Sequence, residues 1–151
     1  MMRRFGGPRR EGVRYRMRPG AYGVILAGRR ALLALTESKG EEIALPGGGI
    51  EAGESPLRAL HREAMEETGW RVSPIRRIGV YRRFTWLPQY GYQAEKVCHI
   101  YLCAAGRQVA APSEPDHQPI WVDVALAAEV LSGAGDRALF LAALRRAGIS
   151  T

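Results

Sequence analysis

A triple glycine followed by a short acidic helix constrains this chain more than any other sequence feature. The glycines are Gly47–Gly49, and the segment Pro56–Thr68 carries the signals of a helix. Ser55 is a suitable N-cap, proline suits the first helical position, and Gly69 suits a left-handed C-cap. The sequence therefore predicts a helix with defined ends directly after a loop whose backbone can approach a ligand closely.

Three glutamates share one face of this helix. Glu63, Glu66 and Glu67 occupy positions i, i+3 and i+4, which fall within a sector of roughly 100°. Like charges so placed repel one another by roughly a few tenths of a kcal/mol per pair. A hard divalent cation held by carboxylate oxygens would offset this repulsion. A solvated acidic face is the plain alternative, but it does not explain the adjacent glycines. An adjacent apolar stripe is expected to anchor the helix on the core, and it comprises Leu57, Leu60 and Ala64.

The same segment matches a known family pattern. Gly48 is followed after five residues by Glu54, and after seven more by the run REAMEETG, which begins at Arg62. The stretch Gly48–Trp70 therefore resembles the Nudix box, and the preceding Leu-Pro-Gly also fits that family. The last position, usually aliphatic, is a tryptophan here, a departure that bears on packing more than on chemistry.

The resemblance implies an activity and a set of site residues. Nudix proteins are mostly Mg²⁺- or Mn²⁺-dependent hydrolases of a nucleoside diphosphate linked to another moiety. By resemblance, Glu63, Glu66 and Glu67 are catalytic and hold the metal, and the Gly48 carbonyl adds a ligand. The family fold implied is α/β, a Nudix-type α/β/α sandwich around a mixed β-sheet.

The resemblance also implies a structural pair and leaves the general base open. Glu54 and Arg62 are expected to pair with each other and brace the loop against the helix. Glu63 is the first choice for the base, since it lies one helical turn before the last box glutamate, beside the expected ions. Family members differ on this point, so Glu95 and Glu114 are alternatives, each equally compatible with an ordinary surface acid.

Residues outside the box suggest how the rest of a substrate is held. Cations are expected to grip the phosphates outside the metal cluster: Arg77 and Arg83 on the polar face of one strand, and Lys96 at the start of another. Tyr90 is expected to stack on a nucleobase, although ordinary packing explains such an aromatic equally well. Two further aromatic candidates, Tyr92 and Trp86, share that ambiguity. The three histidines share no spacing and are interpreted as ordinary core or surface residues: His61, His99 and His117.

The order of the expected elements predicts a single domain of α+β or α/β layers, with helices on both sides of a mixed sheet. Arg82 interrupts the apolar side of its strand, which is compatible with a bulge or a bend there. Strands are expected at Ala21–Ala27, Ala31–Leu35, Glu42–Leu45, Ile75–Trp86, Lys96–Ala104 and Ile120–Val122. Later helices are expected at Val124–Leu131, capped by Asp123, and from an N-cap at Asp136 to about Ala147. Loops are expected at Ser38–Glu41, Leu87–Ala94 and Ala110–Gln118.

The positive charge is concentrated at the N-terminus. The chain has 151 residues and a net charge of +7, of which residues 1–18 supply +6 from seven arginines and Glu11. We therefore expect a flexible, Arg-rich arm at residues 1–18, not needed to complete the sheet, and one Nudix domain at residues 19–151. The arm could contact RNA or another polyanion, but a solvated extension is favoured.

The remaining composition excludes several classes of protein. No apolar run approaches the ~20 residues needed to span a bilayer, so no membrane partner is expected. Cys98 and Cys103 lie five apart on one expected strand and face opposite sides, so they cannot pair with each other. Unpaired cysteines fit a reducing cytoplasm. A homodimer is neither required nor excluded.

Two hypotheses on function follow. The first is a metal-dependent pyrophosphohydrolase of a nucleotide-type substrate, such as a nucleotide, a dinucleoside polyphosphate or a nucleotide sugar. The second is a Nudix-fold sensor that binds a nucleotide without significant turnover and regulates through its basic arm. Sensors tend to lose box carboxylates, and none is missing here, which favours the enzyme. No substrate motif beyond the box selects one compound.

Overall fold

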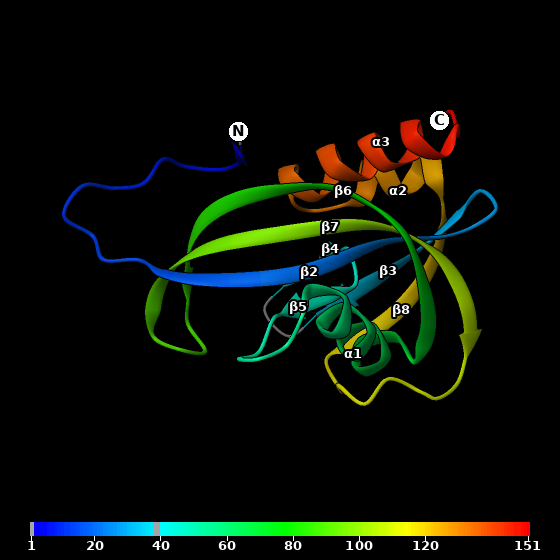
Figure 1. Cartoon of the computed structure of the whole chain (residues 1–151), viewed down its shortest axis with the longest axis horizontal. Coiled ribbons are helices and arrows are strands. Elements are labelled where there is room, and N and C mark those ends of the chain that lie inside the picture. Colours follow the sequence, from blue (N-terminus) through cyan, green and yellow to red (C-terminus); the bar gives the residue numbers. More distant parts are fainter. Residues whose placement is uncertain (1, 38–39) are drawn as a thin grey trace.

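The computed structural model describes residues 2–37 and 40–151. A mixed sheet lies between helices on its two faces (Figure 1). Helix α1 (Pro56–Thr68) covers one face, and α2 (Val124–Val130) and α3 (Ala134–Ala147) cover the other. The α/β architecture predicted from the sequence is therefore confirmed.

Eight strands form the sheet in the described part of the chain. They run in the order β1-β6-β7-β2-β3-β4, while β5 pairs with β2 and β8 pairs with β3. The pairs β1–β6 and β2–β7 are parallel and the others are antiparallel, so the sheet is mixed as predicted. The strands are β1 (Arg3–Arg4), β2 (Arg16–Ala27), β3 (Arg30–Thr36), β4 (Glu42–Ala44), β5 (Gly47–Gly49), β6 (Trp70–Leu87), β7 (Tyr92–Gln108) and β8 (His117–Asp123).

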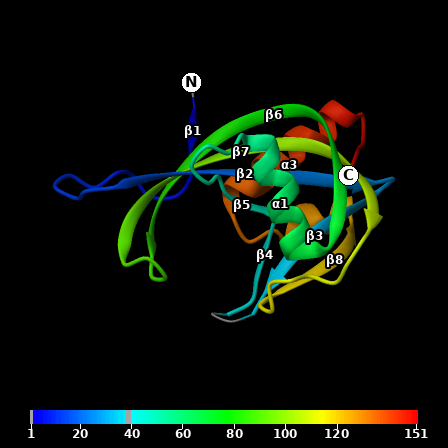
Figure 2. The same cartoon turned by 60° about the horizontal axis from the view of Figure 1, so that its bottom comes forward.

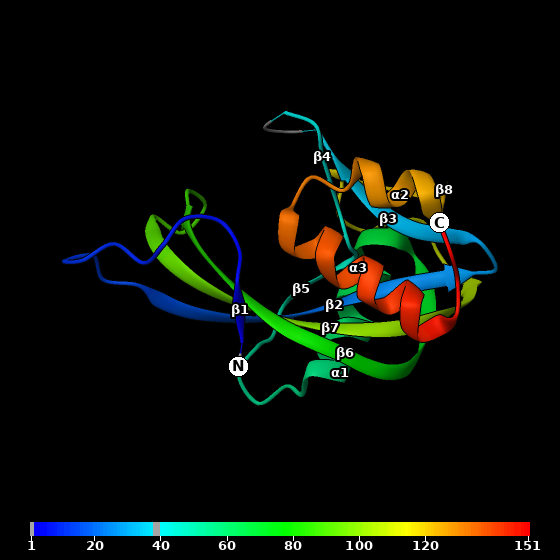
Figure 3. The ribbon, with the colours of Figure 1, turned by 90° about the horizontal axis from the view of Figure 1, so that it is seen from above.

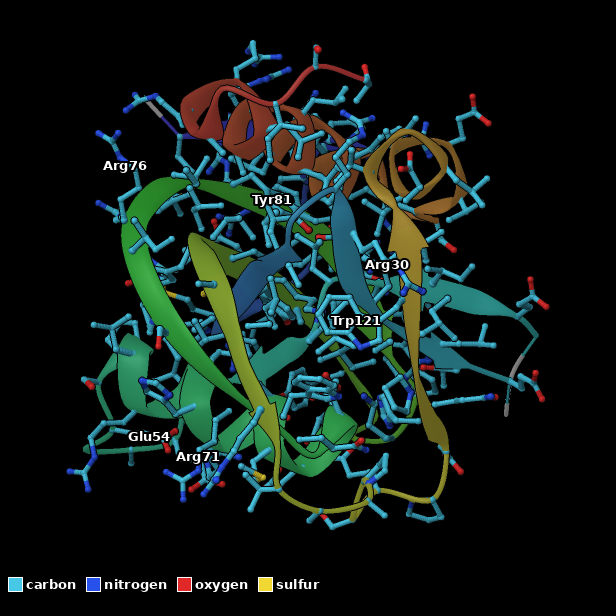
Figure 4. All side chains as sticks on the ribbon, turned by 90° about the vertical axis from the view of Figure 1, so that its right-hand side faces the viewer. Arg30, Glu54, Arg71, Arg76, Tyr81 and Trp121 are labelled. Carbon is cyan, nitrogen blue, oxygen red and sulfur yellow. The ribbon has the colours of Figure 1, made fainter. Side chains whose placement is uncertain are left out.

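Each face of the sheet has its own apolar cluster. The cluster beneath α2 and α3 contains Phe140 and Cys98, and the cluster beneath α1 contains Leu60 and Cys103. Both cysteines are free and buried, so their predicted placement on opposite faces is confirmed. Figure 4 shows the two layers: Tyr81 lies beneath α3, and Trp121 lies lower, nearer to α1.

Helix α1 has the predicted ends. The Ser55 hydroxyl accepts a hydrogen bond from the Arg58 N–H at 3.2 Å, and Gly69 adopts a left-handed φ of 76°. Leu60 and Ala64 are fully buried. Leu57 is 41% exposed, so its expected place in the buried stripe is wrong, because Leu57 lies outside the apolar cluster that contains Ala59 and Leu60.

The triple glycine is a strand and not the predicted loop. Gly47–Gly49 pairs antiparallel with Gly20–Tyr22 of β2, and Figure 2 shows α1 in front of these strands. A Cβ atom at Gly47, where φ is +148°, would collide with the backbone of β2, and one at Gly48 would lie 2.6 Å from Glu63 Oε2. Glycine therefore permits β5 to close against both β2 and α1.

The β6–β7 hairpin is longer than the sequence suggested. Half of the predicted loop Leu87–Ala94 belongs to strands, and residues 88–91 connect them. The irregularities of β6 lie near its start and between Arg77 and Gly79, not at Arg82. Because an extra residue reverses the alternation of faces, Arg77 lies on the opposite face from Tyr81, whose side chain lies in the core and is 7% exposed.

The N-terminal arm contributes to the sheet. Strand β1 pairs in parallel with β6, and Phe5 packs edge-on against Tyr81, with 5.4 Å between ring centroids. Residues 16–18 form the start of β2 and pair with residues 94–96 of β7 (Figure 3). The expectation that the arm does not complete the sheet is wrong, because it covers the otherwise unpaired edge of β6. The boundary at residue 18 stays a prediction.

The C-terminal helices follow the prediction with one correction. Asp123 caps α2 through a 2.9 Å bond from the Ala125 N–H. Asp136 does not cap α3, which begins after Gly133. Its buried carboxylate instead accepts hydrogen bonds from Tyr81 Oη at 2.7 Å and from the Leu45 N–H at 3.1 Å. Of the predicted loop Ser38–Glu41, residues 38 and 39 lie outside the described residues. None of the described helices is long and apolar enough to cross a membrane.

Candidate active site

The glutamates of α1 lie against strand β5. Glu67 is 8% exposed, and its Oε1 accepts a hydrogen bond from the Gly47 N–H at 2.9 Å. Glu63 lies beside Gly48, where any side chain would displace its carboxylate. The glycine strand therefore fixes the position of two box carboxylates with its own backbone.

Arg62 ties the segment after β5 to α1. Its Nε and Nη2 donate to the two carboxylate oxygens of Glu54 at 2.8 and 2.9 Å, the geometry of a bidentate pair. Nη2 also donates to the Gly49 carbonyl at 2.9 Å, and Nη1 donates to Glu63 Oε1 at 2.9 Å. Hydrogen bonds from Arg62 lower the pKa of Glu54 to about 2.

The loop between β7 and β8 packs against α1 and brings residues that are remote in sequence to the box glutamates. The backbone N–H groups of Ser113 and Glu114 donate to the Glu66 carbonyl at 2.9 and 3.1 Å. The Val109 N–H donates to the Gly69 carbonyl at 2.8 Å. A Cβ atom at Gly69 would collide with the backbone of Ala110, so glycine permits this close contact. These bonds dock the loop on the C-terminal end of α1 and bring Glu114 to the box glutamates.

Five side chains form two overlapping groups with the spacing of metal ligands. In each group the ligand atoms lie within 4.8 Å of one another, and Glu114 belongs to both. The first group is Glu63, Glu66 and Glu114, and the second is Glu67, Glu114 and His117. The structure thus brings all three box glutamates into one acidic cluster. The other alternative base, Glu95, pairs instead with Arg82 at 3.5 Å.

His117 was not foreseen as part of this cluster. Its Nε2 lies 3.1 Å from Glu67 Oε2 and its Nδ1 lies 2.9 Å from Glu114 Oε2. Its hydrogen bond to Glu67 and the charge of Glu114 raise the pKa of the imidazole, against the opposing effect of burial. The sequence alone indicates an ordinary core or surface histidine at this position, because only the folding of the loop onto α1 brings it to the cluster. His61 is exposed and His99 lies half-buried on β7.

The cluster fits a hard divalent cation. Burial raises the pKa of Glu63 to about 7, and the charges of Glu67 and Glu66 add to this, while Arg62 opposes it. Four carboxylates supply the oxygen ligands that Mg²⁺ and Mn²⁺ prefer. A bound cation would relieve both the desolvation and the mutual repulsion of these groups.

A cavity of about 370 Å³ opens beside the cluster. Its walls include the three glycines of β5, Glu67 and His117. Two of the predicted substrate-binding residues, Lys96 and Tyr90, also line it, together with Arg18 and Tyr22.

The other predicted cations lie outside this cavity. Arg83 lines an adjoining hollow of about 60 Å³, which also includes Lys96 and Asp136. Arg77 lines a separate pocket with His99, because the irregularity between Arg77 and Gly79 places it on a different face from Arg83.

The predicted aromatic residues differ in their surroundings. Tyr92 stacks on Tyr90 with 5.7 Å between ring centroids. Trp86 is 51% exposed and lines a shallow pocket near the arm. Trp70, which ends the box, packs against Trp121 at 5.2 Å, so its departure from the pattern is absorbed by packing.

Comparison with known proteins decides the family. The family model of the NUDIX domain matches residues 16–144. The chain belongs to the Nudix family. This Nudix protein is accordingly a pyrophosphohydrolase of the class that acts on nucleoside diphosphate derivatives.

Solved structures share the fold of this Nudix protein. A NUDIX hydrolase from Nitrosomonas europaea has a TM-score of 0.70 and 18% identity, over 88% of this chain and 90% of that one. A MutT protein from Bacillus halodurans has a TM-score of 0.68 and 22% identity, over 82% and 80%. A MutT NUDIX hydrolase from Burkholderia pseudomallei has a TM-score of 0.64 and 22% identity, over 83% and 97%. At these identities the likeness shows the fold alone.

Proposed function

We propose that this Nudix protein is a divalent-metal-dependent hydrolase that cleaves the diphosphate linkage of a nucleoside diphosphate joined to another moiety. One observation carries the proposal: the box glutamates gather into a single acidic cluster, and one of them, Glu67, lines a cavity together with the glycines of β5. A cavity of about 370 Å³ is of the size that small-molecule sites occupy.

The residues that would hold the ion lie in the acidic cluster, and two of them, Glu67 and Gly48, also line the cavity. Glu63, Glu66 and Glu67 would be its ligands, with the Gly48 carbonyl and Glu114 beside them. Mg²⁺ or Mn²⁺ would supply neutralisation of the diphosphate charge and would polarise the attacking water.

The protein's own groups would supply the remaining chemistry. Glu63 is the proposed general base, because its carboxylate lies at the surface of β5 and is oriented by Arg62. Glu114 is the alternative, since it lies in the same cluster, whereas Glu95 lies in an ion pair with Arg82.

Substrate recognition would come from other residues in and beside the cavity. Lys96 lines it and Arg83 lines the adjoining hollow, so both are proposed to bind phosphate oxygens. Tyr90 is 54% exposed at the rim, where a nucleobase would find an aromatic surface. Arg77 is left out because it lines a different pocket.

The proposal includes a setting for the enzyme. We infer a small nucleotide-type substrate and, from two free and buried cysteines, a reducing cytoplasm. Nucleic acid is not favoured as the main partner of the basic arm, and a homodimer is neither required nor excluded.

A substrate screen tests the proposal. Phosphate release would be measured from a library of nucleoside diphosphate derivatives, with Mg²⁺, with Mn²⁺ and after exhaustive EDTA treatment. We expect turnover of at least one compound that depends on either ion. Tight nucleotide binding without turnover of any compound would favour the sensor hypothesis instead.

A further inference from the structure

Three cationic side chains form a row across the sheet. The register pairs Arg83 of β6 with Lys96 of β7, and Lys96 with Arg18 of β2. Directly paired residues on neighbouring strands point to the same face, and neighbouring strands lie about 4.8 Å apart. Figure 3 shows the three strands side by side where the hairpin extends away from the helices. Three positive charges therefore stand next to one another on one side of the sheet.

This row has no ion-pair partner among the described residues. The protein's ion pairs within 4.0 Å include none of the three. On the opposite face, by contrast, Arg82 pairs with Glu95 at 3.5 Å. The nearby Asp136 already accepts hydrogen bonds from Tyr81 and Leu45. Two carboxylates, Glu42 and Asp136, line the hollow with Lys96 and Arg83, but neither forms an ion pair within 4.0 Å with a cation of the row. Like charges directly opposite each other destabilise a sheet, so the row favours a bound anion.

Aromatic rings hold two of the cations without neutralising them. The Arg18 guanidinium lies 4.6 Å from the centroid of Tyr90, and Lys96 Nζ lies 5.8 Å from that of Tyr22. Such contacts restrict the side chains but leave their donors available to a ligand. Tyr90 thus has a second role beside the proposed stacking, that of a positioning residue for Arg18.

The row leads away from the acidic cluster within connected hollows. Arg18 and Lys96 line the cavity that the β5 glycines and Glu67 also line. Lys96 continues into the adjoining hollow, where it meets Arg83. If the scissile diphosphate of a substrate lies at the glutamates, the phosphates beyond it would therefore lie along these cations.

We propose that Arg18, Lys96 and Arg83 form a binding row for a polyphosphate chain, so that the preferred substrates carry at least three phosphates. The inference rests on the proposed function and deepens it by naming the substrate class. It also assigns a substrate-binding role to Arg18, which the sequence placed in a solvated arm.

Binding of inorganic tripolyphosphate in EDTA tests the row without metal or turnover. Isothermal titration calorimetry would compare the full-length protein with Arg18→Gln, Lys96→Gln and Arg83→Gln. Each substitution is expected to weaken binding about 10-fold or more, since each removes a charge-assisted contact. Pyrophosphate is expected to bind more weakly than tripolyphosphate, because it reaches fewer of the three cations.

Two variants provide matched controls with the same loss of charge. Arg16 stacks on Tyr92 at 4.7 Å, two residues before Arg18, but does not line the cavity. Arg77 lies on another face. Arg16→Gln and Arg77→Gln should change affinity less than about twofold at 0.15 M salt, where distant charges are screened.

The outcomes separate this inference from the proposed function. Equal losses of tripolyphosphate affinity in Arg18→Gln and Arg16→Gln would contradict the proposed binding row, even if hydrolysis is intact. Equal affinity of the wild type for pyrophosphate and tripolyphosphate would also contradict it. Row-dependent binding in a protein that hydrolyses no compound in the screen would support the row and contradict the proposed function.

Discussion

The identity of the general base is decided by single side chains. Glu63 and Glu114 lie in the same acidic cluster, and Glu95 lies in an ion pair elsewhere. We expect Glu63→Gln to lower kcat by roughly 10²–10⁴-fold, the usual contribution of a general base, and Glu114→Gln to lower it less. Glu95→Gln is the control and should leave kcat near normal. A larger loss in Glu114→Gln would assign the base to the loop instead.

At this scale the sequence predicted the residues whose roles follow from local spacing. The shared face of the box glutamates follows from the geometry of one helix, and the pairing of Glu54 with Arg62 was implied by the resemblance to the family motif. Glu114 and His117 reach the cluster only because a loop some fifty residues later donates hydrogen bonds to the end of α1. No local pattern marks such a contact, so His117 was missed.

At the scale of the element, two leucines of α1 that the sequence places in the same apolar stripe differ in their exposure to solvent. Leu60 is fully buried and Leu57 is 41% exposed. Leu60→Ala should lower the free energy of unfolding by roughly 2–5 kcal/mol by leaving a cavity, and Leu57→Ala should lower it by less than about 1 kcal/mol. Urea unfolding of both variants measures the difference. Similar losses would mean that α1 does not pack as the structure shows.

The brace between Glu54 and Arg62 gives a pH dependence. In the folded state the pKa of Glu54 is about 2, below its ordinary value of 4.5. The pair therefore contributes stability that is present above about pH 4.5 and is lost as pH falls towards 2. We expect the difference in unfolding free energy between wild type and Glu54→Gln to shrink over that window in urea titrations.

A neighbouring glutamate provides the control for this experiment. The Glu51 side chain is 72% exposed and lies 3.8 Å from the same arginine. Exposed pairs contribute little, so Glu51→Gln should change stability only slightly at any pH. A Glu54 effect that stays constant from pH 5 to pH 2 would show that the loop is braced by something other than this ion pair.

The lengths of the strands and the faces on which their side chains lie could be predicted only in part from the sequence pattern. Caps and apolar runs located the helices and most strands, because these signals are local. The extension of β6 and β7 through the predicted loop depends on pairing between the strands, and the reversal of faces after Arg77 depends on a register shift. Neither the strand extension nor the register shift can be predicted from the alternation of polar and apolar residues.

For the whole molecule, the N-terminal segment is the strongest test of how the parts depend on one another. Residues 16–18 pair with β7, and Arg18 lines the cavity. Deletion of residues 1–15 should leave hydrolysis of small substrates near normal, whereas deletion of residues 1–18 should raise KM about 10-fold or more. Steady-state kinetics of the two truncated proteins measures this, with thermal unfolding to check the fold.

The two truncations distinguish the alternatives for this segment. Equal and near-normal activity would restore the original expectation of an independent arm and would count against a role for Arg18. Loss of activity already on deletion of residues 1–15 would mean that β1, which covers the edge of β6, is needed for the fold. Strongly salt-dependent RNA binding that disappears in both forms would support the nucleic-acid alternative.

The central claim is that the acidic cluster holds a divalent ion that the hydrolysis requires. The most direct measurement is kcat for the best substrate of the screen, in Mg²⁺ and after EDTA treatment, for wild type, Glu67→Gln and the exposed control Glu51→Gln. We predict that EDTA abolishes turnover and that Glu67→Gln lowers kcat by on the order of 10²–10³-fold with its thermal midpoint retained, while Glu51→Gln behaves as wild type. Turnover that survives EDTA, or a near-normal rate in Glu67→Gln, would contradict the account.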